Sequence, residues 1–323
     1  MPVACAAAET DANVTGETVH TLAQAQTYTE VAKSCCRPAP RPCAQRLTRR
    51  DEPEVRRFLA QRPLQSFGLL GMITDNGLVS PHNRGDFHAY RGARNQIEGV
   101  ALIGHNTVLD ARSDEAIASF SELAKATANP FLLLAPEPQM FRFVECYADS
   151  LYNHQAMDCY NLFDFRGAPA KPALAPLPDV RLATPGDLDE VVWANNQCGI
   201  EEIGVDSLAL DAAGFTSRCA RRIARGRTWV WVERGRLIVK LDVMTLTPEV
   251  AYLESLWVRP EARRKGYGAR FLGQVSERLR KDSANVCFLA DKNKSWEQSL
   301  YRNVGYVTIE RFGVVFCDRT RTC

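Results

Sequence analysis

The sequence predicts a mixed α/β fold that is divided into two domains. Helical and strand periodicities alternate along both halves of the chain, which is the pattern of sheets flanked by helices. The 323 residues have room for about two domains, because one takes roughly 100 to 200 residues, and a hydrophobic fraction of 46% is ample for two cores. Four prolines in residues 167–178 predict a semi-rigid linker between the halves.

The domain boundaries follow from this linker and from the composition of the N-terminal segment. Residues 1–46 have little large apolar content and end in a proline-rich run, so we expect a poorly ordered extension. The segment has no continuous apolar core of a secretory signal, and its acidic residues weaken an organelle-targeting interpretation. Whether it belongs to the mature protein stays open. The two domains are then residues 47–166 and 179–323.

The first domain is predicted to run helix, strands, helix, strand. The expected elements are a helix containing Val55, Phe58 and Leu59, adjacent strands at 87–90 and 97–109, an amphipathic helix at 114–126 and a buried strand at 131–135.

The second domain is predicted to begin with a strand, followed by helices and then by three antiparallel strands. The expected elements are a strand at 180–183, a helix ending near 197, a hairpin of 228–232 and 237–246 turning at Arg234–Gly235, a strand at 249–258, a helix at 269–280, a strand at 286–290 and a helix at 293–303. Gly305 is the expected stop of the last helix, because glycine adopts the left-handed cap conformation at little cost.

A basic, glycine-containing loop at 263–268 lies between the strand ending at Val258 and the helix beginning at Ala269. Glycines let a backbone approach phosphate oxygens closely, and the free N–H groups of a helix N-terminus attract an anion. The order strand, loop, helix therefore predicts a pyrophosphate site. A nucleoside-triphosphate loop is excluded because Gly268 is followed by alanine and arginine, and a dinucleotide fingerprint is excluded because residue 271 is phenylalanine.

The remaining spacing, Arg263-x-x-Gly266-x-Gly268, resembles motif A of the GNAT acyltransferase superfamily. The preceding Val258-Arg259-Pro260 fits the end of the strand before that motif, and the run from Leu300 to Tyr306 resembles motif B. The resemblance covers residues 178–317. It implies tandem GNAT-like domains, each a mixed, mostly antiparallel twisted sheet flanked by helices. The first domain has no such motif, so we expect it to be degenerate and not to bind the cofactor in the usual manner.

The resemblance implies that the loop binds the pyrophosphate of acetyl-coenzyme A, and that a bulge in the preceding strand frees a backbone N–H for the thioester oxygen. The cofactor-binding residues that it implies are Leu256, Trp257, Val258, Arg263, Arg264, Lys265, Gly266, Tyr267, Gly268, Ala269 and Asn293.

Two side chains are the candidates for catalysis. Tyr301 matches the motif B tyrosine, which would return a proton to the leaving thiolate; the alternative is an aromatic packing residue. Glu254 is the candidate base, because counting by twos from Leu256 places both on one strand face; the alternative is a solvent-facing or salt-bridged glutamate. Glu201 and Glu202 are expected in a loop over the acceptor pocket or as plain surface charge.

The net charge and the cysteine content limit the kinds of partner, metal site and compartment that we expect. A formal net charge of +2 gives no electrostatic footprint for nucleic acid, and no apolar run reaches the length that a bilayer span needs. The eleven cysteines lack paired Cys-x-x-Cys spacing, so we expect free thiols in a reducing, cytoplasmic compartment and no metal site. A homodimer stays open.

The sequence thus predicts an acetyl-coenzyme A-dependent N-acetyltransferase in which an amine attacks the thioester directly in a ternary complex. Two alternatives remain: a non-catalytic acyl-coenzyme A-binding regulatory protein, and a tandem-domain synthase of the mycothiol-synthase kind. The expected acceptor is a small molecule or a peptide with an amine; its identity and the acyl chain preference are left open by the motifs.

Overall fold

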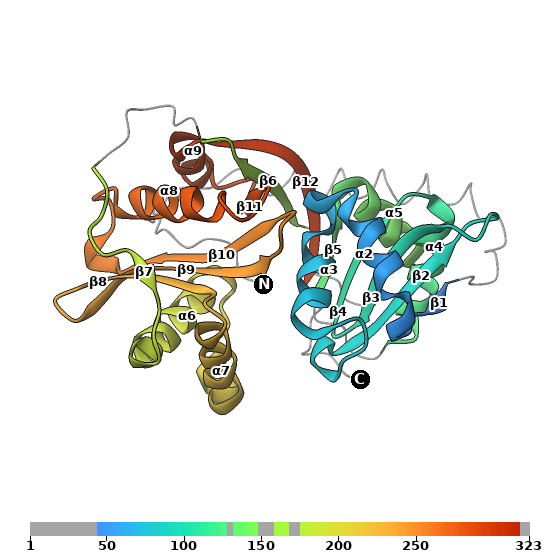
Figure 1. Cartoon of the computed structure of the whole chain (residues 1–323), viewed down its shortest axis with the longest axis horizontal. Coiled ribbons are helices and arrows are strands. Elements are labelled where there is room, and N and C mark those ends of the chain that lie inside the picture. The colour runs from blue at the N-terminus through green and yellow to red at the C-terminus, as the bar shows by residue number, and fades with distance from the viewer. Residues whose placement is uncertain (1–43, 128–131, 148–157, 168–174, 317–323) are drawn as a thin grey trace, which may run out of the picture.

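A single sheet runs through the whole molecule (Figure 1). The computed structural model describes residues 44–127, 132–147, 158–167 and 175–316. Their strands form a 12-stranded sheet in the order β1-β2-β3-β4-β5-β12-β6-β11-β10-β9-β8-β7.

The first half of the chain supplies one end of this sheet. Its main elements are β1 (Gln45–Arg46), α2 (Glu52–Ala60), α3 (Pro63–Asn76), β2 (Gly85–Arg91), β3 (Ile97–Gly104), β4 (Asn106–Ala111), α4 (Asp114–Lys125), β5 (Leu132–Pro136), α5 (Glu137–Tyr147) and β6 (Asp158–Phe165).

The second half supplies the other end. Its main elements are β7 (Arg181–Leu182), α6 (Leu188–Ile203), α7 (Ser207–Ala224), β8 (Thr228–Glu233), β9 (Arg236–Leu246), β10 (Ala251–Val258), α8 (Tyr267–Leu279), β11 (Val286–Asp291), α9 (Ser295–Val304) and β12 (Tyr306–Phe316). Figure 1 shows α8 and α9 on one face of these strands and α6 and α7 on the other.

Most of the expected elements are present, with a few differences. The strand expected at 97–109 is two strands, because the chain turns at His105. The helix expected to end near 197 continues to Ile203, where Gly204 caps it in the left-handed conformation. Residues 45–46 were expected in the extension but pair with β2; the rest of the extension, residues 1–43, lies outside the described residues.

The two halves of the sheet exchange strands at its centre. Strand β6, from the first half, lies between β11 and β12, and β12, from the second half, lies between β5 and β6. Each end of the sheet thus has six strands, five from one half of the chain and one from the other. The sheet crosses the predicted boundary at 167–178, and the boundaries themselves stay a prediction.

Both halves contain one parallel strand pair at the corresponding place in the sheet. In the first half β4 pairs with β5, and in the second half β10 pairs with β11. The pairing of β10 with β11 is confined to Ala251 with Val286 and Tyr252 with Cys287, although both strands continue beyond these residues. The two strands therefore diverge toward their C-terminal ends and leave a gap.

Helix α3 from the first half packs on β9 and β10 of the second half. The Phe67 ring stacks on Tyr252 with centroids 4.0 Å apart, and Thr245 Oγ1 donates a hydrogen bond of 2.9 Å to the Phe67 carbonyl oxygen. The chain has glycine at 71, where a Cβ would lie 2.0 Å from Thr245 Oγ1. The close approach of the helix to the strand therefore requires glycine at this position. This contact of α3 joins the two halves of the chain beside β10.

Candidate active site

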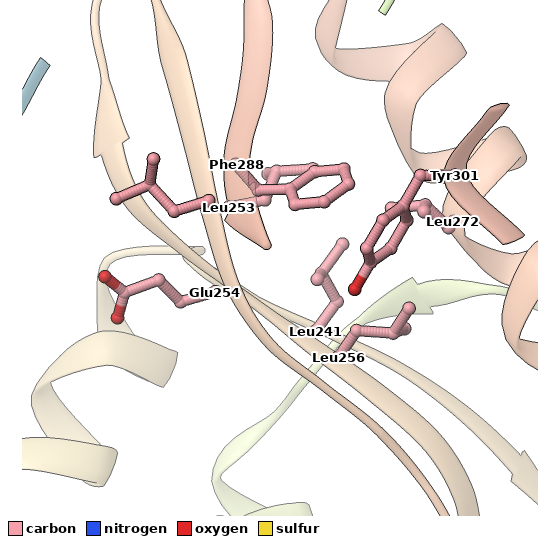
Figure 2. Close-up of a pocket in the computed structure, with 8 residues that line it drawn as sticks. Leu241, Leu253, Glu254, Leu256, Leu272, Phe288 and Tyr301 are labelled. Atoms are coloured by element: carbon pink, nitrogen blue, oxygen red, sulfur yellow. The ribbon is translucent and has the colours of Figure 1, made fainter. Parts of the chain in front are cut away.

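A pocket occupies the gap between the diverging strands β10 and β11 (Figure 2). Apolar side chains from four strands and helices form most of its wall, and two of its members, Glu254 and Tyr301, are titratable. The lining residues are Leu241, Leu253, Glu254, Leu256, Leu272, Phe288, Leu289 and Tyr301. A narrow apolar slot with two proton-transferring groups at its edge suits a reaction that must be shielded from water.

A bulge in β10 shapes one wall of the pocket. Glu254 pairs with Asp242 and Trp257 with Lys240, so two residues of β10, Ser255 and Leu256, oppose one residue of β9. Ser255 has a φ of 54°, a conformation that is uncommon for a residue other than glycine. The regular ladder between β9 and β10 is thus interrupted at Ser255 and Leu256, beside the pocket.

The bulge also overturns the expected strand face of Glu254. Leu256 lies with Leu253 in the core cluster under α8, whereas Trp257 packs with α6 and α7 on the opposite face. Because the extra residue breaks the alternation, Glu254 shares its face with Trp257 rather than with Leu256. Figure 2 shows its carboxylate directed away from Tyr301, so the two titratable groups approach the pocket from opposite sides of β10.

Glu254 lies in a buried, charged environment on the α6 and α7 face. It is 5% exposed, and no described residue donates a hydrogen bond to its Oε1 atom. Burial raises its pKa to about 7; the positive charge of Arg222 opposes this shift and the negative charge of Asp242 adds to it. A carboxylate with this pKa can accept a proton near neutral pH.

A hydrogen-bonded network holds the cross-strand neighbour of Glu254 in place. Asp242 accepts hydrogen bonds from Lys240 at 2.7 Å, from Arg222 at 2.8 Å and from Thr228 at 2.7 Å. Lys240 also donates to Asn195 of α6. Since Lys240 and Asp242 are fully buried, this network fixes the charge beside Glu254.

Tyr301 closes the other side of the pocket. Its ring lies 3.9 Å from Phe288 and 5.6 Å from Phe163, measured between centroids, and the residue is 2% exposed. Burial, together with the negative charges of Glu297 and Glu202, raises the pKa of its hydroxyl well above the ordinary value. The hydroxyl is therefore protonated throughout the physiological range and can act as a donor. Its packing role and a catalytic role are compatible.

The loop after β10 presents an open helix terminus. Arg264 and Gly266 have φ values of 61° and 75°, and Gly266 is the N-cap of α8 with no side chain capping the helix and no acidic residue in the first turn. A Cβ on Gly268 would lie 3.1 Å from Val258 Cγ2, so glycine allows the helix to begin close to the end of β10. Such a terminus attracts an anion.

Comparison with known proteins identifies the second half of the chain. Residues 224–308 match the family model described as an acetyltransferase (GNAT) domain. These residues belong to the GNAT acetyltransferase family. No curated protein matches the chain in sequence.

Solved structures show that the fold of the first half is GNAT-like as well. An acetyltransferase of the GNAT family from Colwellia psychrerythraea superposes with a TM-score of 0.53 at 12% identity, over 84% of this chain and 98% of the other. A Drosophila protein gives 0.59 at 14%, over 85% and 98%. A tandem GNAT protein from the clavulanic acid biosynthesis pathway gives 0.50 at 15%, over 86% and 99%. The expected tandem fold, with mostly antiparallel twisted sheets, is confirmed.

The two GNAT-like halves differ at the helix that follows the fourth strand. In the first half this helix is α4, whose N-cap Ser113 accepts a hydrogen bond from the Ala116 N–H and whose first turn contains Asp114 and Glu115. A capped terminus with two negative charges repels a pyrophosphate. Gln139 of α5 also accepts a hydrogen bond of 2.8 Å from the Ala111 N–H at the end of β4. The N-terminus of α4 is thus capped by a side chain and negatively charged, unlike that of α8.

Arg263 contacts the end of β10 and the end of α6. Its Nε donates to the Val258 carbonyl oxygen at 2.9 Å, and its NH2 group donates to both carboxylate oxygens of Glu201 at 2.9 Å. The guanidinium therefore ties the loop to the end of α6. Lys265 donates to the Glu261 carbonyl oxygen at 3.0 Å and is exposed.

The other residues that the resemblance implies for cofactor binding differ in how far their side chains are buried. Trp257 is fully buried against Trp193 of α6, 5.2 Å between centroids, so it can offer only its backbone to the pocket. Tyr267 packs edge-on against Trp231 at 4.9 Å. Asn293 is exposed in the turn before α9, and its N–H donates to Asp291 at 2.8 Å. Arg264 is exposed, and Ala269 lies partly buried in the first turn of α8.

Glu201 and Glu202 lie in the last turn of α6 and not in a loop. Glu202 accepts a hydrogen bond of 3.4 Å from the Cys198 thiol, whereas its Oε2 atom receives none from any described residue. Sequence analysis missed Glu297, which lies one turn before Tyr301 on the buried face of α9. The sequence could have indicated Glu297, because it occupies an otherwise apolar position of an amphipathic helix.

The described residues have the character neither of a membrane span nor of a metal site. None of their helices combines the length and the apolar character that crossing a membrane requires. Within the same residues, no group of three or more histidine, cysteine, aspartate or glutamate side chains is arranged to hold a metal ion. Cys146, Cys159, Cys198, Cys219 and Cys287 are free thiols.

Proposed function

We propose that the protein is an acetyl-coenzyme A-dependent N-acetyltransferase that transfers the acetyl group to an amine by direct attack in a ternary complex. The observation that carries the proposal is the pocket at the β10 bulge, which is bounded by Glu254 on one side and Tyr301 on the other and lies beside the open terminus of α8. The GNAT family membership of residues 224–308 supports the same reaction class.

The residues around the α8 terminus fit an acyl-coenzyme A donor. The N–H groups of the first helical turn, with Gly266 as an uncapped N-cap, suit a pyrophosphate, and the exposed side chains of Arg264 and Lys265 add positive charge beside it. The apolar slot between Leu253, Leu256 and Phe288 suits an uncharged chain. When bound, the donor supplies the activated acyl group.

The titratable residues can balance the protons of the reaction. The amine loses a proton to Glu254, directly or through water, and forms the new bond to the acyl carbon while the carbon–sulfur bond breaks. Tyr301 gives its proton to the departing sulfur. With a pKa of about 7, Glu254 is a stronger base than an ordinary carboxylate by about 2.5 units, which lowers the free energy of proton transfer by about 3 kcal/mol.

A tandem-domain synthase remains the second candidate. Helix α3 of the first half packs on β9 and β10, the two strands that supply Leu241 and Glu254 to the pocket, so the first half lies close to the strands of the site. The fold of a tandem GNAT protein of a biosynthetic pathway supports this arrangement. In this version the acceptor contacts both halves.

Calorimetry and thiol release test the proposal together. Acetyl-coenzyme A should bind the wild-type protein, and Gly266→Val should abolish binding because the position has a φ of 75° and its backbone must approach the phosphates. Gly235→Val is the matched control, since Gly235 has a φ of 76° in the β8–β9 turn, away from the site. The absence of acetyl-coenzyme A binding by the folded wild-type protein would refute the proposal. Binding without thiol release from a panel of amines would favour the regulatory alternative.

A further inference from the structure

Strand β10 is held weakly by its neighbouring strands at the place where it carries Glu254. Its pairing with β11 ends at Tyr252. On its other side, the ladder with β9 is irregular directly before Leu253 and again directly after Glu254. Between these two irregularities, the pairs that Leu253 and Glu254 form with β9 are the regular part of the ladder. The position of the Glu254 carboxylate must therefore depend on side-chain packing as well as on the sheet.

The first half of the chain packs on β10 at Tyr252, the last residue that pairs with both β9 and β11. The Phe67 ring of α3 stacks on the Tyr252 ring, with centroids 4.0 Å apart and 23° between the planes, and the two residues are 1% and 2% exposed. Tyr252 and Glu254 lie on the same face of β10, because they are two residues apart and the extra residue of the first irregularity belongs to β9. Phe67 thus fixes β10 directly before Glu254.

A second contact of α3 holds β9 at the first irregularity. The extra residue of β9 at this place is Met244, which the pairing with β10 skips. The Met244 carbonyl oxygen accepts a hydrogen bond of 3.3 Å from Arg227 NH1, and Arg227 NH2 donates to Asp75 Oδ1 of α3 at 2.8 Å. Arg227 is 9% exposed, so this chain of bonds is largely shielded from water. Helix α3 therefore acts on both strands, through Phe67 on β10 and through Asp75 on β9.

We infer that the first half of the chain positions the catalytic base: Phe67 and Asp75 of α3 hold β9 and β10 so that the Glu254 carboxylate keeps its place at the pocket. This inference rests on the proposed function, in which Glu254 is the base. Phe67 and Asp75 are not among the residues that line the pocket, so both are positioning residues that act through the strands. Such positioning matters because a displacement of about 1 Å can slow a reaction by about 10²-fold.

The protonation of Glu254 reports whether the carboxylate is in place. Titratable side chains of four elements act on it or on its cross-strand neighbour: Lys240 and Asp242 of β9, Arg222 of α7, Glu202 of α6 and Tyr252 of β10. Burial is the largest cause of its raised pKa of about 7. If β10 shifts and water reaches the carboxylate, this pKa falls toward the ordinary value of 4.5.

Variants of α3 test the inference by turnover. Phe67→Leu removes the stacked ring but keeps an apolar side chain, and Asp75→Asn removes the charge that pairs with Arg227. In thiol release from acetyl-coenzyme A with the most reactive amine of the panel, kcat should fall at least about tenfold in Phe67→Leu and severalfold in Asp75→Asn. Calorimetric affinity for acetyl-coenzyme A should stay within about twofold of wild type. Phe120→Leu is the matched control and should retain kcat, because Phe120 is fully buried in a separate core cluster of the first half.

An NMR titration separates this inference from the proposed function, because it involves no turnover. The protein is labelled with ¹³C at the glutamate carboxyl groups, and the Glu254 signal is assigned by its loss in Glu254→Gln. The pKa should be about 7 in wild type and in Phe120→Leu, and at least about one unit lower in Phe67→Leu. Asp75→Asn should shift it in the same direction, and this variant decides the question if Phe67→Leu does not fold.

The two measurements have distinct outcomes. If no amine releases thiol but the pKa difference is found, the positioning of Glu254 by the first half stands and the acetyltransferase proposal fails. A wild-type pKa of Glu254 in both α3 variants, or an equal shift in Phe120→Leu, overturns the inference.

Discussion

Replacing Glu297 by glutamine should stabilise the protein, and only at neutral and higher pH. Burial raises the pKa of Glu297 from its ordinary value of 4.5 to about 7, an effect that Lys294 partly offsets. The folded state therefore binds this proton more tightly than the unfolded state does. Consequently the contribution of Glu297 to the unfolding free energy falls as pH rises from about 4.5 to about 7, and it stays low above that.

The magnitude follows from the difference in pKa between the two states. A shift of about 2.5 units corresponds to about 3 kcal/mol, because one unit is about 1.4 kcal/mol, and this is a large part of the usual stability of a domain. Glutamine keeps the shape of the side chain and has no charge. The variant should match wild type near pH 4.5 and exceed it by up to about 3 kcal/mol at pH 8.

Urea unfolding at pH 4.5, 6, 7 and 8 provides the measurement, with Glu277→Gln as the exposed control that should track wild type at every pH. The difference between wild type and Glu297→Gln should grow with pH. A difference that is constant from pH 4.5 to 8 would refute the reasoning, because it would mean that the carboxylate is paired and titrates normally.

Three further predictions concern the catalytic pocket. Glu254→Gln should lower kcat/KM by a factor of about 10² to 10⁴, as measured by thiol release over pH 5.5–9. In wild type kcat/KM should rise with pH up to about pH 7, and the variant should lose this rise. If the rise persists in the variant, it comes from the titration of another group. Tyr301→Phe should retain acetyl-coenzyme A binding in calorimetry and slow turnover, and an unchanged kcat would exclude Tyr301 as the acid. Gly268→Ala should weaken acetyl-coenzyme A binding severalfold, because the new Cβ would lie 3.1 Å from Val258 Cγ2. Gly273→Ala is the control and should bind normally, because its Cβ would lie 3.5 Å from Val304 Cγ1, an ordinary contact. Equal affinities of the two variants would show that α8 can shift to accommodate the Cβ at 268.

Features that depend on neighbouring residues were predictable from the sequence. The β8–β9 turn follows from Arg234–Gly235, which have φ values of 51° and 76°, and Gly305 ends α9 in the left-handed conformation as expected. The loop at 263–268 was found by the same local reasoning, since its glycine spacing and flanking elements are contiguous in the chain.

Features that depend on distant contacts were not predictable. The resemblance implied a bulge in this strand, but the local sequence does not show which residue bulges, and counting by twos from Leu256 assumed a regular strand, so the expected face of the Glu254 carboxylate was wrong. The bond of Arg263 to Glu201 joins residues that are far apart in sequence, so the sequence did not indicate this tie between the loop and α6. Strand exchange likewise leaves no mark in local periodicity.

The exchange of β6 and β12 constrains the order in which the protein can fold. Strand β5 must wait for β12, since Leu132 pairs with Phe316, and the first half therefore emerges from the ribosome with one side of β5 unpaired. An uncovered strand edge invites association with other chains, and pairing between such distant residues is slow. Folding should thus be cooperative across the whole molecule, and a chain ending before β12 would expose the edge of β5 permanently.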